Sequence, residues 1–375
     1  MARKSKQELK EIMKQFGVDD IYSWSKYNTY ENSIYEYFLR YVKKVKEDRK
    51  DGIYGVSGGV SHQILEDYYL NKIKYEDMIN AYEDKLFEMN MAELKYNRSD
   101  DEKNDNIANK YEDCLKHFFK NHTVIKGKVK IERFITILVG EYLFQGYIDC
   151  IHKEDDYFII TDFKTSTAYT GKKIDKEKGQ LVLYAEGLRQ LGVPLDKIKI
   201  RWNFLKYVCV DVEQANENIV TRNIGRNEIG EKLRTNIKMW LKKSGYSEEE
   251  IENYLELVVN SNDIEHLPEE VKSKYKIYDC YVYIPLNEEV VEDLKQKIVT
   301  TLNEIKEKEE EYKKTKDEMV WDEEITDGQS FYFANLSGYS ANLHKPYARY
   351  LEKINMFKNE EDNDNEDDLS WLEEI

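Results

Sequence analysis

The feature that most constrains this chain is a pair of neighbouring runs rich in aromatic and β-branched residues. The runs cover Phe144 to Ile151 and Tyr157 to Phe163, and a polar turn at 153–156 separates them. This pattern predicts a β-hairpin. Because side chains alternate along a strand, Asp162 and Lys164 are expected on one face, and the hairpin can bring Asp149 alongside them.

Two carboxylates and a lysine in this arrangement indicate metal-dependent cleavage of a phosphodiester. A half-buried charge is costly unless it is paired or binds a metal. In this interpretation Asp149 and Asp162 are oxygen ligands of a divalent cation, and the carbonyl of Phe163 completes its shell. Lys164 would orient the attacking water or neutralise developing charge. The alternative is that Asp162 and Lys164 form an ordinary surface ion pair at the end of a strand.

Two predicted helices carry further polar candidates. Apolar residues recur at helical spacing between Lys176 and Leu191, where Gln180 and Tyr184 lie one turn apart. That pair can equally be a core tyrosine beside a solvated glutamine. Upstream, the run 57–61 reads as the capped start of a helix that carries His62 and Glu66 on one face, although a lone helical histidine is more often structural.

Taken in order, these residues resemble a RecB-like exonuclease of the PD-(D/E)xK nuclease superfamily. The matching pieces are Ser25 to Tyr30, Gly58 to Glu66 with His62 between them, Glu132 on a strand, Gly146 to Asp149, Asp162 to Thr165, and Gln180 with Tyr184. Each piece is weak alone, but their order is specific. The resemblance covers roughly residues 20 to 210, with a fainter echo near the C terminus.

The resemblance implies a fold, a cofactor and a set of roles. The fold is α/β, with a restriction-endonuclease-like core in which helices flank a mixed central sheet that carries large helical insertions. The cofactor is Mg²⁺ or Mn²⁺. The implied metal ligands are His62, Asp149, Asp162 and the Phe163 carbonyl; Lys164 is catalytic, Gln180 and Tyr184 position DNA phosphate or the lysine, and Glu66 and Glu132 are secondary candidates.

One departure from the family concerns an iron–sulfur cluster that many RecB-like nucleases hold with one N-terminal and three C-terminal cysteines. Here Ser33 occupies the N-terminal position, and the C-terminal echo at 331–347 contains no cysteine. We therefore predict that the cluster is absent and that apolar packing between the two ends replaces it. The four cysteines, Cys114, Cys150, Cys209 and Cys280, are scattered without metal-ligand spacing and read as reduced thiols.

The net charge of −17 argues at first against DNA binding, which needs cationic surface. Nine acids and no base lie between Asn359 and Ile375, however, so the rest of the chain carries −8. A lysine cluster follows the catalytic strand and could contact a DNA backbone, with four further cations extending the track; the alternative is an ordinary solvated face. The cluster is Lys172, Lys173, Lys176 and Lys178, and the extension is Arg201, Lys206, Arg222 and Arg226.

Composition changes suggest four segments along the chain. We expect an N-terminal helical region with the histidine motif at 1–123, the nuclease core sheet at 124–210, a helical C-terminal region at 211–358 and a disordered acidic tail at 359–375. The tail is expected to dock on a replication or recombination protein, to mimic DNA, or only to increase solubility. No run is long and apolar enough to serve as a secretion signal or membrane span, so a cytoplasmic enzyme is expected, in the host cytoplasm if a phage encodes it.

These observations favour a metal-dependent DNA exonuclease of recombination, repair or replication, plausibly encoded by a phage or mobile element. A nuclease-derived DNA-binding or scaffolding subunit that recruits partners through its acidic tail is the alternative of a different class. A structure-specific endonuclease is a third possibility, because the same site serves both reactions.

Overall fold

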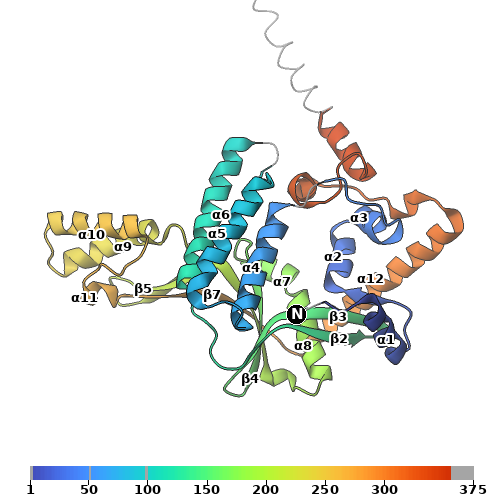
Figure 1. The fold of residues 1–375 in the computed structure, drawn as a ribbon, viewed down its shortest axis with the longest axis horizontal. Helices are drawn as coiled ribbons and strands as arrows, with labels where there is room; N and C mark the ends of the chain where they lie inside the picture. The colour runs from blue at the N-terminus through green and yellow to red at the C-terminus, as the bar shows by residue number, and fades with distance from the viewer. Residues whose placement is uncertain (1–2, 50–51, 98–99, 356–375) are drawn as a thin grey trace, which may run out of the picture. The chain divides into compact units, whose positions relative to one another are not determined.

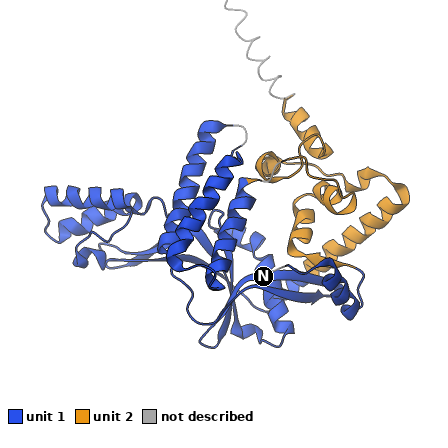
Figure 2. Cartoon of the chain, in the orientation of Figure 1, with its two compact units in different colours: residues 1–19, 53–295 blue, residues 20–52, 296–375 orange. Residues whose placement is uncertain are grey.

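The computed structural model describes residues 3–49, 52–97 and 100–355, which fall into two compact units. Unit 1 comprises residues 1–19 and 53–295, and unit 2 comprises residues 20–52 and 296–375 (Figure 2). The acidic tail predicted at 359–375 lies outside the described residues. The predicted four-segment division of the chain stays a prediction.

A mixed sheet forms the centre of unit 1. Its strands are β2 (Val129–Val139), β3 (Tyr142–Glu154), β4 (Tyr157–Lys164), β5 (Ile198–Glu213), β6 (Ile219–Gly225) and β7 (Tyr275–Ile284). The predicted hairpin is confirmed, since β3 and β4 pair antiparallel with Cys150 opposite Thr161. β4 pairs parallel with the first half of β5, and β5 pairs antiparallel with β6 and β7. A parallel pair needs a crossover, and here two helices supply it.

Helices cover both faces of this sheet, which confirms the predicted α/β core (Figure 1). α4 (Ile53–Tyr69), α5 (Met78–Met91) and α6 (Asp101–Asn121) contact one side, and α8 (Gly179–Gln190) contacts the other. The buried core under α4–α6 includes Tyr82, Phe118, Cys150, Phe163 and Leu205. This core fixes α4 against the strands that carry the acidic residues.

A second core lies around the distal half of β5. It is built from β6, β7, α9 (Ile229–Lys243), α10 (Glu248–Ser261) and α11 (Glu269–Lys272). The helices were predicted, but β6 was not, because its first five residues are exposed and largely polar, as is common for an edge strand. The remaining helices that start in unit 1 are α1 (Lys6–Phe16), α7 (Lys172–Glu177) and α12 (Glu288–Thr315).

Two predicted helix boundaries are wrong. α4 begins at Ile53 and not after the run 57–61, because Ser57 and Ser61 are buried inside the helix and the Ser61 hydroxyl donates to the Ser57 carbonyl at 2.9 Å. The helix predicted from Lys176 to Leu191 is two helices, α7 and α8, with the junction at Lys178. The buried face of α8 is as predicted, except that Leu191 follows the helix and is exposed.

Unit 2 joins two distant parts of the chain. It contains β1 (Ile21–Ser23), α2 (Trp24–Asn32), α3 (Ile34–Tyr37), most of α12 and a last helix whose described part spans 345–355. Short π-helical segments occur at Phe38–Val42 and Tyr332–Leu336. α2 and α3 therefore complete their core only with residues from the C-terminal third of the chain.

Ser33, the position compared with a cluster cysteine, lies in a buried polar network of unit 2. Its hydroxyl donates to the Glu323 carboxylate and lies 3.1 Å from His344 Nε2, while Ile34 N–H donates to the same carboxylate at 2.9 Å. Buried Glu36 accepts from Ser337 at 2.8 Å. The two ends pack on each other as predicted, with the Phe38 and Trp321 rings stacked at 5.5 Å between centroids, and hydrogen bonds to buried carboxylates add to this packing.

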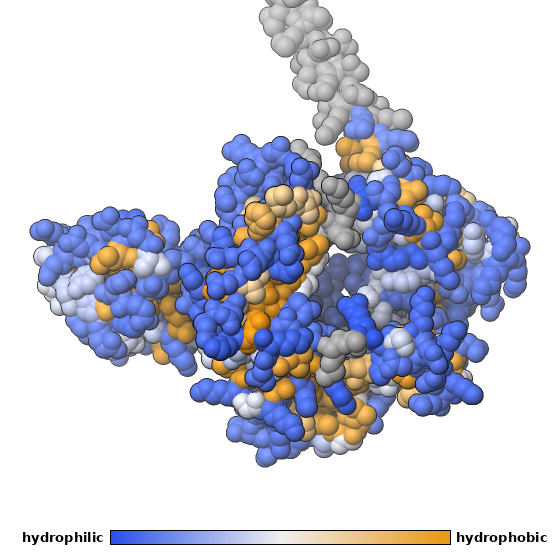
Figure 3. All heavy atoms as spheres, in the orientation of Figure 1, coloured by the Kyte–Doolittle hydropathy of each residue, from blue (hydrophilic) through white to orange (hydrophobic). Residues whose placement is uncertain are grey.

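Polar side chains dominate the surface that Figure 3 displays. All four cysteines are buried and free. Among the described residues, no helix combines the length and the apolar character that a membrane crossing requires.

Candidate metal centre

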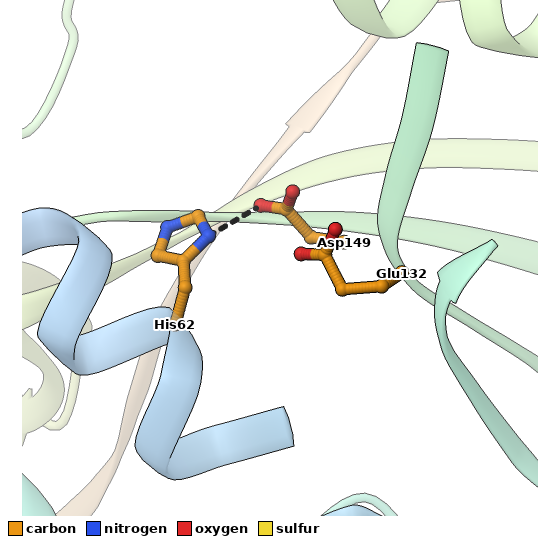
Figure 4. A group of neighbouring side chains, drawn as sticks. All are labelled: His62, Glu132 and Asp149. Carbon is orange, nitrogen blue, oxygen red and sulfur yellow. Dashed lines mark ion pairs between the residues drawn. The ribbon is translucent and has the colours of Figure 1, made fainter. Parts of the chain in front are cut away.

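Three side chains from three elements of unit 1 converge next to the hairpin (Figure 4). His62 comes from α4, Glu132 from β2 and Asp149 from β3, and one ligand atom of each lies within 4.8 Å of the others. One imidazole and two carboxylates form a donor set suited to a divalent cation. Of the predicted ligands, His62 and Asp149 belong to this group, and Glu132 enters it from among the secondary candidates.

His62 is oriented by the neighbouring strand. Its Nε2 lies 2.9 Å from the backbone carbonyl of Phe163, which can only accept a hydrogen bond, so the Nε2 carries a proton. In the neutral ring Nδ1 then presents a lone pair, and it lies 3.5 Å from Asp149 Oδ2. Two acceptors that face each other repel unless a proton or a metal ion lies between them. A histidine whose second nitrogen donates to a carbonyl is the usual arrangement at a metal.

Glu132 and Asp149 lie between two consecutive pairs of the β2–β3 ladder, Ile131 opposite Cys150 and Arg133 opposite Ile148. The two acids are not themselves a ladder pair, and Glu132 has a φ of 49°, a left-handed conformation that is strained for a glutamate. Their carboxylates are nevertheless close enough to share a ligand. A cation between them would offset the repulsion of the two like charges.

The protonation equilibria of the two acids reflect this crowding. Burial raises the pKa of Asp149 from 3.8 to about 6, and the neighbouring carboxylate of Asp162 adds to the rise, although His62 and Lys164 oppose it. A hydrogen bond from Phe163 N–H to Asp149 Oδ2, at 3.0 Å, also favours the charged form. Burial likewise raises the pKa of Glu132, with a smaller contribution from Glu66. A cation bound here would lower the pKa of both groups.

Asp162 and Lys164 form an ion pair of 2.8 Å between Oδ2 and Nζ at the end of β4. The pair is no surface feature, since the Asp162 side chain is only 5% exposed. Burial alone would lower the pKa of Lys164, but the Asp162 carboxylate more than offsets this and raises it. The lysine is therefore held as a cation beside the three-residue group. The metal-binding roles predicted for Asp162 and for the Phe163 carbonyl stay predictions.

Gln180 and Tyr184 meet on α8, where Gln180 Nε2 donates to the Tyr184 hydroxyl at 3.1 Å. Tyr184 is buried, and its ring fills the space beside Gly146, where an added Cβ would lie 2.4 Å from a ring carbon. The glycine of the Gly-x-x-Asp motif thus makes room for the tyrosine. This role of Gly146 was not predicted; its spacing of three residues from Asp149 was the available signal.

The predicted cationic track is only partly exposed. Lys172, Lys173 and Lys176 are exposed on α7, while Lys178 pairs with Asp175 at 2.8 Å. The predicted extension through Arg201 and Arg226 is wrong, because both side chains are buried. Arg226 pairs with Asp279 at 2.6 Å in the interior.

The fold and the site together define a class of protein. It has an α/β core, a cluster of one histidine and two carboxylates, and an Asp–Lys pair at the end of a strand of its mixed sheet. A model of the PD-(D/E)XK nuclease superfamily matches residues 22–319. Since this match spans most of the chain, the chain belongs to the PD-(D/E)XK nuclease superfamily. Members of this superfamily are usually nucleases that use divalent metals. A search of curated proteins found no match to the chain.

Proposed function

We propose that this chain is a RecB-like DNA exonuclease that depends on Mg²⁺ or Mn²⁺ and acts in recombination, repair or replication. The observation that carries the proposal is the convergence of His62 Nδ1, 3.5 Å from Asp149 Oδ2, with Glu132 beside them. This donor set suits a divalent cation, and it lies in a chain of a nuclease superfamily. A phage or mobile-element origin and a cytoplasmic location stay predictions.

His62, Glu132 and Asp149 would hold the cation, joined by Asp162 and the Phe163 carbonyl as the motif implies. The carbonyl accepts from His62 with one lone pair and retains a second. A divalent cation in such a site lowers the pKa of a bound water and neutralises charge on the phosphate. The protein contributes ligands whose orientation is fixed by β2, β3 and α4 before substrate arrives.

Lys164 would act as a cation and not as a general base. Its ammonium is held 2.8 Å from Asp162, which keeps it protonated at neutral pH. A fixed positive charge next to the cluster can stabilise the negative charge that develops on a phosphate during cleavage. Gln180 and Tyr184 would position the phosphate or the lysine, and Lys172, Lys173, Lys176 and Lys178 would contact the DNA backbone.

Digestion of end-labelled linear DNA and of covalently closed circular DNA tests this proposal. We expect the wild type to degrade the linear DNA with Mg²⁺ or Mn²⁺ and to leave the circle intact, because an exonuclease needs an end. Asp149→Asn and Lys164→Met should each abolish most of the activity, whereas Asp156→Asn, in the exposed turn between β3 and β4, should retain it.

The other outcomes separate the alternatives. Cleavage of the circle would identify an endonuclease. Wild-type inactivity on every substrate, with DNA binding retained, would favour a scaffolding subunit. Truncation after Lys358 tests the proposed docking of the acidic tail on a replication or recombination protein: DNA cleavage should persist while partner binding is lost.

A further inference from the structure

A pocket of unit 1 lies away from the metal centre. Its volume is about 330 Å³, and the charged and titratable residues of its lining are Lys126, His152, Lys153, Glu154, Arg201 and Asp279. Arg201 stands beside Thr161 in the β4–β5 register, on the strand face that Phe163 shares. Asp162 and Lys164 point to the opposite face. The pocket therefore uses none of the residues assigned to DNA cleavage.

Arg201 is a buried cation that has no carboxylate partner among the described residues. Its side chain is 5% exposed and donates to the hydroxyls of Thr161, at 2.9 Å from Nε, and Tyr283, at 2.7 Å from Nη1. The guanidinium also lies 3.7 Å from the ring centroid of Tyr281. Hydroxyls and a ring stabilise a guanidinium but do not neutralise it, and a buried unpaired charge is costly.

Asp279, the buried acid of the pocket lining, is already engaged. Asp279 accepts from Arg226 at 2.6 Å and from Thr123 N–H at 2.9 Å, so both of its oxygens are occupied. Arg226 neutralises that carboxylate. The charge of Arg201 is thus left for a ligand.

His152 also lines the pocket, with a side chain that is 95% buried. Its Nε2 lies 3.9 Å from Glu154, which is within reach of an ion pair if the ring is protonated but too far for a hydrogen bond. At the exposed rim, the positive charges of Lys126 and Lys153 outnumber the single negative charge of Glu154.

We propose that this pocket binds a phosphate-bearing small molecule of about mononucleotide size, with Arg201 contacting the phosphate oxygens and Lys126 and Lys153 adding positive charge at the rim. Arginine matches phosphate geometry through its planar fork of donors. The volume lies at the small end of the range for ligand sites, which suits a mononucleotide better than an oligonucleotide. The proposal does not rest on the proposed nuclease activity.

Isothermal titration calorimetry of the full chain in EDTA tests this proposal. The separate probes are deoxyadenosine monophosphate, deoxyadenosine and inorganic phosphate. EDTA removes cation-mediated binding at the metal centre. We expect the monophosphate to bind and the nucleoside not to bind. Binding of inorganic phosphate as well would show that the phosphate group alone is recognised, and failure of inorganic phosphate would show that the nucleoside part contributes.

Matched variants locate the binding. Arg201→Met should weaken binding of the monophosphate at least tenfold. Lys153→Glu, at the exposed rim, should weaken binding several-fold, and it keeps the test available if Arg201→Met does not fold. Arg222→Met, which removes one exposed charge from β6, and Asp149→Asn should leave the affinity unchanged. Absence of binding by the wild type, or affinity that survives both Arg201→Met and Lys153→Glu, would overturn the proposal.

Discussion

Replacing Asp149 by asparagine should stabilise the metal-free protein at neutral pH. The carboxyl has a folded pKa of about 6 against an ordinary value of 3.8, and its side chain is only 12% exposed. The folded state therefore favours the protonated carboxyl. The stability that this preference contributes is complete below pH 3.8 and is lost as the pH rises through 6. The difference is about two pH units, and at about 1.36 kcal/mol for each unit the loss is at most about 3 kcal/mol.

Asparagine keeps an oxygen that can accept from Phe163 N–H, but it cannot ionise when the pH rises. The free energy of unfolding of Asp149→Asn, relative to wild type, should rise by up to about 3 kcal/mol between pH 4 and pH 7.5 in EDTA. Urea denaturation followed by circular dichroism measures this, with Asp156→Asn as the exposed control. Addition of Mn²⁺ at pH 7.5 should reverse the ranking, because only the wild type retains the charged ligand.

A difference between Asp149→Asn and wild type that stays constant from pH 4 to pH 7.5 would refute the reasoning. So would equal stabilisation of both proteins by Mn²⁺. The first result would mean that the carboxylate is not desolvated in the folded chain, and the second would mean that it is not a ligand.

Three further predictions concern the site and its surroundings. Lys164→Met should lower kcat for linear DNA by on the order of 100-fold while Mn²⁺ binding measured by calorimetry persists, because it removes a charge and no expected ligand. Gly146→Ala should lower the free energy of unfolding by roughly 1–3 kcal/mol through collision with a buried tyrosine ring, whereas Gly59→Ala, whose Cβ meets nothing within 4 Å, should raise it by about 0.5–1 kcal/mol. Thermal melts compare these two variants. Arg226→Met should cost about 3–5 kcal/mol by leaving Asp279 buried and unpaired, with no selective loss of DNA affinity in a filter-binding assay of the folded fraction.

The parts of the fold that the sequence predicted are those governed by local periodicity. The hairpin follows from the runs of aromatic and β-branched residues in β3 and β4. The start of α4 could not be predicted, because a Ser-Gly-Gly run is typical of a loop and only the buried contacts of Ser57 favour the helix. The sequence did not predict β6 for the converse reason, since an exposed edge strand needs no apolar alternation.

The same distinction applies to the site. Asp149 and Asp162 lie on one hairpin, so strand geometry brought them together in the prediction. The position of Glu132 depends on the register between β2 and β3, together with a left-handed residue that sequence does not reveal. The burial of Arg201 and Arg226 was missed because cations are exposed in most proteins, and only the tertiary structure shows otherwise.

The discontinuous composition of unit 2 has a consequence for the order in which the chain can fold on the ribosome. Between Gly52 and Gln296 lie about 240 residues, all assigned to unit 1. At roughly 5–20 residues per second, synthesis of that stretch takes on the order of ten to fifty seconds. Throughout this interval the newly made helices α2 and α3 carry the buried tyrosines Tyr27, Tyr35 and Tyr37 without the partners that cover them in the finished protein. We therefore expect nascent chains to expose these aromatic segments until the residues after Gln296 have been made.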